Sequence, residues 1–335
     1  MMNNNLHSSV KAELIILSLF LLCAPTIANV QISTPKQVIF DVDGGGDDIF
    51  ALALAFLNPT LINVVAITTV FGNTGTYNCT KNVLRTLQVF NRSDVPVYVG
   101  STKGLVYPFT GDHFFGYDGL GDNEWSEPLQ QNPETIHAAI FLSEFVRQHP
   151  GQITLIATGA LTNVALAQQL NPSFFGDLAE LYVMGGAYLG RGNIRPGVEF
   201  NFFADPLAAE FVLLEAHNNT VVTLLPLEAT PAIPTAWRVN VLGTINSPYI
   251  KFLNKAERKI LSSKTWSPND QVTAAIAMCS NLVKASLDAD GIVLTEGCDA
   301  KGALLIDYKS TSYNLKIITQ VDEAAFQNFV LNSFR

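Results

Sequence analysis

The segment that decides the fold reads Val-Ile-Phe-Asp-Val-Asp-Gly-Gly-Gly-Asp-Asp and runs from Val38 to Asp48. Its first three residues are apolar and typical of a buried strand, and the apolar residues from Ile49 to Leu57 recur at helical period. The three glycines between them allow the backbone to turn tightly. The segment therefore predicts a strand, a short turn and a helix, with four carboxylates at the end of the strand.

The same alternation of strand and helix continues along the chain. We expect strands over 38–40, 62–70, 97–99, 153–157, 181–184 and 221–225, and helices over 49–57, 80–90, 136–147, 163–169 and 206–214, followed by a mainly helical region over 247–287. No linker or repeat interrupts this order. The pattern predicts one α/β domain with a Rossmann-like, mainly parallel central sheet flanked by helices, and places ligands at the carboxyl ends of the strands. The aperiodic stretch 100–133 is expected to be a functional loop.

The N-terminal residues have the features of a secretory signal. Lys11 precedes an apolar run from Leu14 to Cys23, and small residues follow as far as Ala28. We expect residues 1–28 to be a signal peptide and residues 29–335 to form a secreted, extracellular domain that is not held in a membrane. Secretion would give meaning to the glycosylation sequons that begin at Asn78, Asn91 and Asn218.

Charge and cysteine content exclude other classes of protein. The formal net charge of −9 repels phosphate backbones, so nucleic acid is not an expected partner. The three cysteines that follow the signal, Cys79, Cys279 and Cys298, have no Cys-x-x-Cys spacing. Neither a zinc cluster nor a disulfide framework is therefore indicated.

The four carboxylates of the turn indicate a cation site. Hard oxygen ligands suit Ca²⁺ or Mg²⁺. Helix capping would explain Asp47 and Asp48 but not the other two carboxylates. A calcium-binding EF-hand loop would need Glu at the position of Leu52. A haloacid-dehalogenase-like phosphatase also carries Asp-x-Asp-Gly after its first strand, but Thr usually follows where Gly45 stands here.

The turn resembles the Asp-x-Asp-Pro-Gly-x-Asp-Asp signature of the inosine-uridine preferring nucleoside hydrolase family, with Gly44 in place of Pro. Segments 68–73, 158–163, 184–186 and 199–206 are similar to further motifs of that family, in the same order. The chain also looks like the secreted purine nucleosidases of blood-feeding insects. The resemblance implies Ca²⁺-dependent hydrolysis of the N-glycosidic bond of ribonucleosides, a nucleoside as the partner molecule, and a homodimer or homotetramer.

The resemblance also implies roles for individual residues. Asp43 would be the general base, since hydrolysis of an N-riboside needs an activated water. The expected metal ligands are Asp43, Asp48, Thr158 and Asp270. The expected ribose-binding residues are Asp47, Asn73, Met184, Asn193, Glu199 and Asn201. Asp205, which precedes a proline, is better explained as a helix cap.

The residues around the leaving base depart from the family pattern. Phe115 and Asn269 stand where many members carry histidine, so an imidazolium donor is missing, and His113 is a possible substitute. Phe114, Phe115 and Tyr117 in the long loop, with Trp266 shortly before Asn269, could instead sandwich a purine. We therefore expect a purine nucleosidase acting on inosine or guanosine. A phosphatase, a non-catalytic nucleoside-binding protein and a structural or partner-binding protein remain as alternatives.

Overall fold

The computed structural model describes residues 34–335 except for residues 218 and 298. The predicted signal peptide, the sequon at Asn218 and Cys298 therefore lie outside the described residues. In the described part of the chain, no helix is long and apolar enough to cross a membrane.

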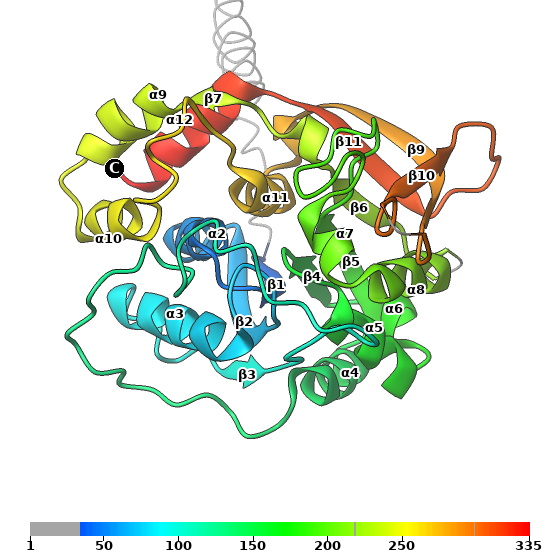
Figure 1. Cartoon of the computed structure of the whole chain (residues 1–335). Coiled ribbons are helices and arrows are strands. Elements are labelled where there is room, and N and C mark those ends of the chain that lie inside the picture. Colours follow the sequence, from blue (N-terminus) through cyan, green and yellow to red (C-terminus); the bar gives the residue numbers. More distant parts are fainter. Residues whose placement is uncertain (1–33, 218, 298) are drawn as a thin grey trace, which may run out of the picture. The chain divides into compact units, whose positions relative to one another are not determined.

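A nine-stranded sheet forms the centre of the domain, with strand order β10-β9-β11-β6-β5-β4-β1-β2-β3 (Figure 1). Its strands are β1 (Lys36–Val42), β2 (Ile62–Thr69), β3 (Val97–Val99), β4 (Ile153–Ala157), β5 (Leu178–Met184), β6 (Val222–Leu225), β9 (Val283–Val293), β10 (Leu304–Asp307) and β11 (Leu315–Val321). The seven strands from β3 through β2, β1, β4, β5 and β6 to β11 pair in parallel, and β9 pairs antiparallel with both β11 and β10. The predicted mainly parallel α/β sheet is thus confirmed.

Helices cover both faces of this sheet (Figure 1). One face carries α2 (Gly46–Leu57), α3 (Thr76–Val89), α10 (Pro248–Ala256), α11 (Asn269–Met278) and α12 (Glu323–Ser333), and the other carries α4 (Ala138–Gln148), α5 (Thr162–Leu170), α6 (Phe174–Asp177) and α8 (Pro206–Ala216). Successive side chains of β1 point to opposite faces of the sheet, which explains the two layers. Val38 and Phe40 belong to the hydrophobic core on the α2 face, and Ile39 belongs to the core on the α5 face.

Short elements complete the domain around the carboxyl ends of the strands. They are α7 (Phe200–Ala204), α9 (Thr235–Asn240), the single turns η1 (Leu227–Ala229), η2 (Leu242–Thr244) and η3 (Ser280–Leu282), and a two-stranded sheet of β7 (Ile233–Pro234) and β8 (Thr265–Trp266). The region 247–287 was expected to be mainly helical, but its last part is the start of β9. This difference arises because β9 pairs with β11, a distant segment that the local pattern does not reveal.

The turn between β1 and α2 requires glycine at position 44. Gly44 has a φ of +74°, and a Cβ atom there would lie 2.5 Å from the Cα atom of Cys79 on α3. Proline, whose φ is held near −65°, could not adopt this conformation. The replacement of the signature proline by glycine therefore matches the backbone of this turn.

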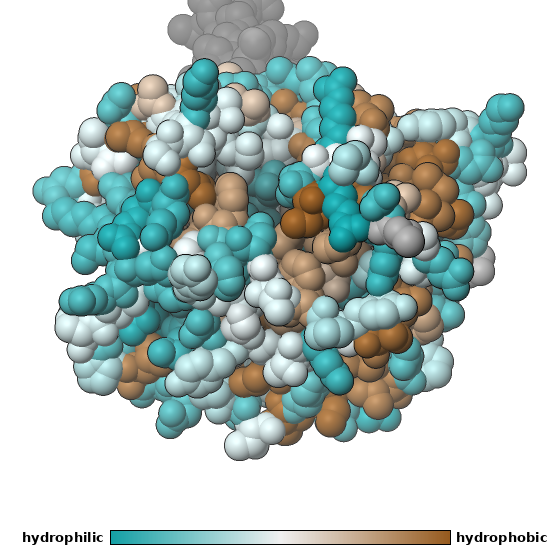
Figure 2. Space-filling model, viewed as in Figure 1, coloured by the Kyte–Doolittle hydropathy of each residue, from teal (hydrophilic) through white to brown (hydrophobic). Residues whose placement is uncertain are grey.

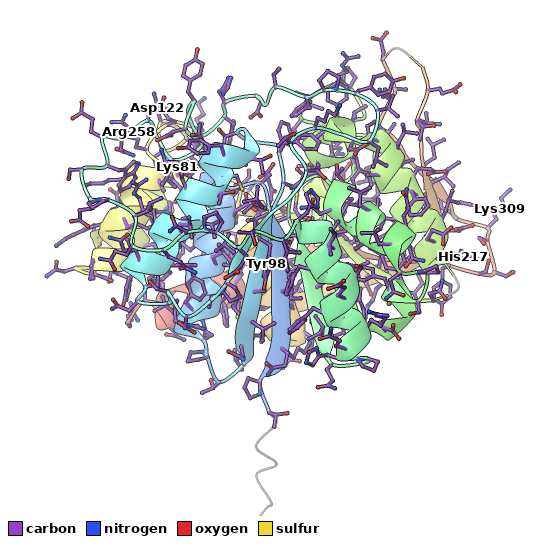
Figure 3. All side chains as sticks on the ribbon, turned by 90° about the horizontal axis from the view of Figure 1, so that it is seen from below. Lys81, Tyr98, Asp122, His217, Arg258 and Lys309 are labelled. Carbon is purple, nitrogen blue, oxygen red and sulfur yellow. The ribbon has the colours of Figure 1, made fainter. Side chains whose placement is uncertain are left out.

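The long loop 100–137 crosses the edge of the sheet where the parallel strands end (Figure 1). It is tied to the segment after α10, because the guanidinium of Arg258 donates hydrogen bonds to the carbonyl oxygens of Gly121 and Asp122. The side chains of Arg258 and Asp122 lie on the same side of the molecule (Figure 3). In space-filling view, a recess opens near the centre of the face that the loop crosses (Figure 2).

Candidate active site

Four aspartates come together where the β1–α2 turn meets the start of α11. Asp43, Asp47 and Asp48 come from the β1–α2 turn, and Asp270 is the second residue of α11, which packs against α2. Asp43, Asp48 and Asp270 are buried. One carboxylate oxygen from each of Asp47, Asp48 and Asp270 lies within 4.8 Å of the other two. Asp270 is not the N-cap of α11, since that position is Pro268.

These carboxylates repel one another strongly. Burial raises the pKa of Asp43, Asp47, Asp48 and Asp270, and the charges of neighbouring aspartates raise the pKa of Asp43, Asp47 and Asp270 further. Two full charges 4.8 Å apart repel by about 3 kcal/mol at an effective dielectric constant of 20. Protons or a cation must compensate this repulsion. Oxygen donors from carboxylates fit a hard divalent cation such as Ca²⁺ or Mg²⁺.

Thr158 and Asp41 hold the turn in place. The Thr158 hydroxyl donates to the Asp48 carboxylate at 2.6 Å, and the Thr158 N–H donates to the Asp41 carbonyl at 2.9 Å. The Asp41 carboxylate accepts hydrogen bonds from Thr68 (2.6 Å) and Asn163 (2.8 Å), and burial raises its pKa to about 7. Sequence reasoning counted Asp41 in the cluster without giving it this supporting role.

The six residues expected to bind ribose all line one cavity of about 280 Å³, together with Asp43, Thr158 and Asp270. This volume is close to the lower end of the usual range for small-molecule sites, roughly 300–1,000 Å³. Asp48 does not line the cavity; it lies beneath the floor, bonded to Thr158 and to the Gly45 N–H (2.9 Å).

Glu199 and Asn201 are held by hydrogen bonds on α7. The Glu199 carboxylate caps the helix and accepts from the backbone N–H groups of Asn201 (2.8 Å), Phe202 (3.0 Å) and Gly186 (3.0 Å). Burial nevertheless raises the pKa of Glu199 to about 7. The Asn201 amide donates to the Thr158 carbonyl at 2.9 Å, which joins the ribose set to the metal set.

Asn73 and Asn193 are likewise oriented by the backbone. The Asn73 N–H donates to the Asp43 carboxylate at 2.8 Å, and the Asn193 side-chain oxygen accepts from the Phe200 N–H at 2.9 Å. Asp205 caps α8, accepting from the Ala208 N–H at 3.2 Å, as the sequence predicts. It does not line the cavity.

The aromatic residues near the mouth divide into two groups. Phe114 and Phe115 line the cavity, with Phe114 exposed and Phe115 buried against Gly46, and their rings meet edge to face at 5.0 Å. Asn269 also lines the cavity, and its side-chain oxygen has no hydrogen-bond partner among the described residues.

Trp266 requires a correction. The sequence suggested that its indole contacts the base, but the side chain is 1% exposed and does not line the cavity. Its N–H donates to Glu257 at 2.8 Å, and its ring stacks on Trp237. The hydrogen bond and the packing make it a core residue. His113 and Tyr117 do not line the cavity either, and their rings lie against each other.

The aspartate cluster and the candidate ribose-binding residues lie in a chain that matches a known family. Residues 38–328 match the family model described as inosine-uridine preferring nucleoside hydrolase. The chain belongs to this family. The nucleoside hydrolase fold also appears in a solved inosine-guanosine nucleoside hydrolase, which is 28% identical with a TM-score of 0.82, covering 89% of this chain and 98% of that one.

Curated nucleoside hydrolases from other organisms are similar over shorter regions. The inosine-uridine preferring nucleoside hydrolase of Leishmania major is 38% identical over 215 residues, which cover 63% of this chain and 67% of that protein. Uridine nucleosidase 1 of Arabidopsis thaliana is 38% identical over 189 residues, 56% of each chain. The matched region thus spans just over half the length of that plant relative. Family membership replaces the phosphatase alternative.

Proposed function

We propose that this protein hydrolyses the N-glycosidic bond of ribonucleosides in a Ca²⁺-dependent reaction that releases ribose and free base. The observation that carries the proposal is one cavity in which Asp43, the candidate base, faces the same space as the candidate ribose ligands. A carboxylate floor suits this chemistry, because the sugar becomes positively charged as the bond to the base breaks.

Asp43 would act as the general base. It would take a proton from a water whose oxygen forms the new bond to the anomeric carbon, while the electrons of the C–N bond leave with the base. The hydrogen bond from the Asn73 N–H orients this carboxylate at 2.8 Å. The ribose hydroxyls would find hydrogen-bond acceptors and donors in Asp47, Asn73, Glu199 and Asn201. Binding of these hydroxyls favours distortion of the sugar.

Asp43, Asp48, Asp270 and the Thr158 carbonyl would hold the cation. When bound, Ca²⁺ neutralises the clustered carboxylates and increases the acidity of a nearby water. The carboxylates of Asp48 and Asp270 lie close to that of Asp47. Burial and the charges of Asp48 and Asp47 raise the pKa of Asp43. This crowding supports a cation at these residues, because a cation relieves a repulsion that protons would otherwise have to relieve. We propose calcium rather than a softer metal because every proposed ligand atom is oxygen.

We further propose a preference for purine nucleosides. Phe114 at the mouth offers an exposed aromatic face for stacking, and a purine can be protonated at N7, whereas uracil has no equally basic ring nitrogen. Because relatives include both uridine nucleosidases and inosine-guanosine hydrolases, the proposal rests on these lining residues. We expect kcat/KM for inosine to exceed that for uridine by at least about a hundredfold, roughly 2.7 kcal/mol in transition-state stabilisation.

Secretion after removal of residues 1–28 and assembly into dimers or tetramers complete the proposal. The test of activity is direct: the protein is incubated with inosine and excess CaCl₂, and ribose is measured as reducing sugar while hypoxanthine is followed by chromatography. A chelator should stop both products, and calcium should restore them. Tight binding of inosine without release of ribose would overturn the hydrolase proposal and favour a nucleoside-binding protein.

A further inference from the structure

Departure of a base from ribose is much easier when the base is protonated, and the cavity contains no obvious donor. Phe115 and Asn269 occupy the positions where histidine was expected. No histidine is among the cavity-lining residues in the described part of the chain. An acid for the leaving base must therefore come from another residue type or from solvent.

Five carboxylic acids line the cavity. Four of them, Asp43, Asp47, Glu199 and Asp270, are assigned above to the water, the ribose or the cation. The fifth is Asp112, which comes from the long loop rather than from the floor. It is two residues before Phe114, so it lies on the side of the cavity where the base would stack.

The loop backbone places Asp112 beside the ribose-binding residues. Gly111 has a φ of +78°, and a Cβ atom at this position would lie 2.8 Å from the Gly72 carbonyl oxygen and 3.1 Å from that of Asn73. The loop therefore packs directly against the segment that carries Asn73. One oxygen of the Asp112 carboxyl accepts a hydrogen bond from the Phe114 N–H at 3.0 Å, which orients the side chain.

We propose that Asp112 is the general acid that protonates the departing base. The inference rests on the proposed nucleosidase activity. The carboxyl proton would pass to N7 of the purine as the C1′–N9 bond breaks and its electron pair moves to the base. Asp112 would be left as a carboxylate, and the proton that Asp43 takes from water balances this loss through exchange with solvent.

The surroundings of Asp112 support this role. Partial desolvation raises the pKa of the Asp112 carboxyl above its ordinary value, which increases the protonated fraction near neutral pH. The residue is also exposed at the mouth, so solvent can return its proton after each turnover. His113, its neighbour, lies against Tyr117 outside the cavity wall.

The test compares two leaving groups in the Asp112→Asn variant of the full protein with excess Ca²⁺. Asparagine keeps the oxygen that accepts from the Phe114 N–H but cannot donate a carboxyl proton. Inosine requires a protonated base, whereas 4-nitrophenyl β-D-ribofuranoside releases a stable phenolate. We expect kcat for inosine to fall at least about a hundredfold, as for loss of a general acid, and kcat for the nitrophenyl riboside to change by less than about threefold.

His113→Asn is the matched control, since asparagine tolerates the left-handed backbone at this position (φ +56°), and it should leave both rates unchanged. Equal losses on the two substrates in Asp112→Asn would show a structural role and overturn the inference. Wild-type rates on inosine would overturn it as well. If the unmodified protein cleaved neither substrate, the proposed function itself would fail, and this outcome is distinct from the previous two.

Discussion

Substitution of Arg238 by methionine should destabilise the wall of the candidate active site, because it breaks a buried ion pair. The Arg238 guanidinium contacts the Glu257 carboxylate at 2.7 and 2.8 Å, and both side chains are fully buried. Glu257 also accepts from the Trp266 indole at 2.8 Å, so the pair joins α9, the end of α10 and β8. Ile260, Ser263 and Thr265, which line the cavity, lie between Glu257 and Trp266 in the chain.

The magnitude follows from the charge that Arg238→Met leaves behind. Removal of one partner of a buried pair costs about 3–5 kcal/mol, because the other charge stays buried without compensation. For a large domain, roughly 2–4 °C of Tm is lost per kcal/mol, so we expect a fall of about 6–20 °C. Partly buried Arg92 and exposed Asp94 form an ion pair at 2.9 Å that solvent reaches, and Arg92→Met should cost about 1 kcal/mol or less.

The loss should also depend on pH. Burial raises the pKa of Glu257, and Arg238 opposes this rise, so the pKa should increase further in Arg238→Met. A raised folded-state pKa means that the folded protein binds more protons than the unfolded chain, and stability falls as pH increases. The variant should therefore be closer to the wild type at pH 5 than at pH 8.

Two experiments with excess Ca²⁺ at both pH values measure these differences: thermal unfolding monitored by circular dichroism, and urea titration. The double variant Arg238→Met with Glu257→Gln should be more stable than Arg238→Met alone, because no buried charge remains. A loss no larger than that of Arg92→Met, or one that does not depend on pH, would refute the reasoning.

Asp43→Ala should reduce kcat for inosine by at least about a hundredfold while the Tm in Ca²⁺ stays within a few degrees of wild type; near-normal turnover would refute its role as base. In a chelator, the Tm should fall from pH 5 to pH 8, because the clustered carboxylates have raised pKa values and so bind more protons in the folded state, and excess Ca²⁺ should reverse this trend. Gly44→Pro, although it restores the family signature, should destabilise the fold by more than about 1 kcal/mol in urea titration, since φ is +74° there. On secretion from eukaryotic cells, Asn91→Gln should remove one glycan by mass spectrometry, since Asn91 lies in an exposed turn. Asn78→Gln should remove none, because Asn78 lies within helix α3 and its amide donates to the Thr74 hydroxyl.

Local patterns in the sequence were sufficient for the central part of the fold, and the resemblance to the family motifs indicated most residues of the candidate site. The alternating apolar residues of β1 and the helical period of α2 depend only on neighbours in the chain. Carboxylates that follow a parallel strand must lie at its carboxyl end, where the ligand sites of such sheets occur. The gathering of Asp43, Asn73 and Glu199 around one cavity agrees with the positions predicted from the motifs.

Only the tertiary structure decided how the side chains of loops are oriented and which distant segments pair. The sequence favoured Trp266 as a base contact. No local signal shows that Glu257 accepts a hydrogen bond from the Trp266 indole N–H, which keeps this side chain in the core. Strand β9 forms because β11 supplies its hydrogen-bonding partner. Asp112 rather than His113 faces the cavity because Gly111 packs on the carbonyl oxygens of Gly72 and Asn73. The direction of a side chain in an aperiodic loop is determined by such contacts with distant backbone, and residue order alone does not contain them.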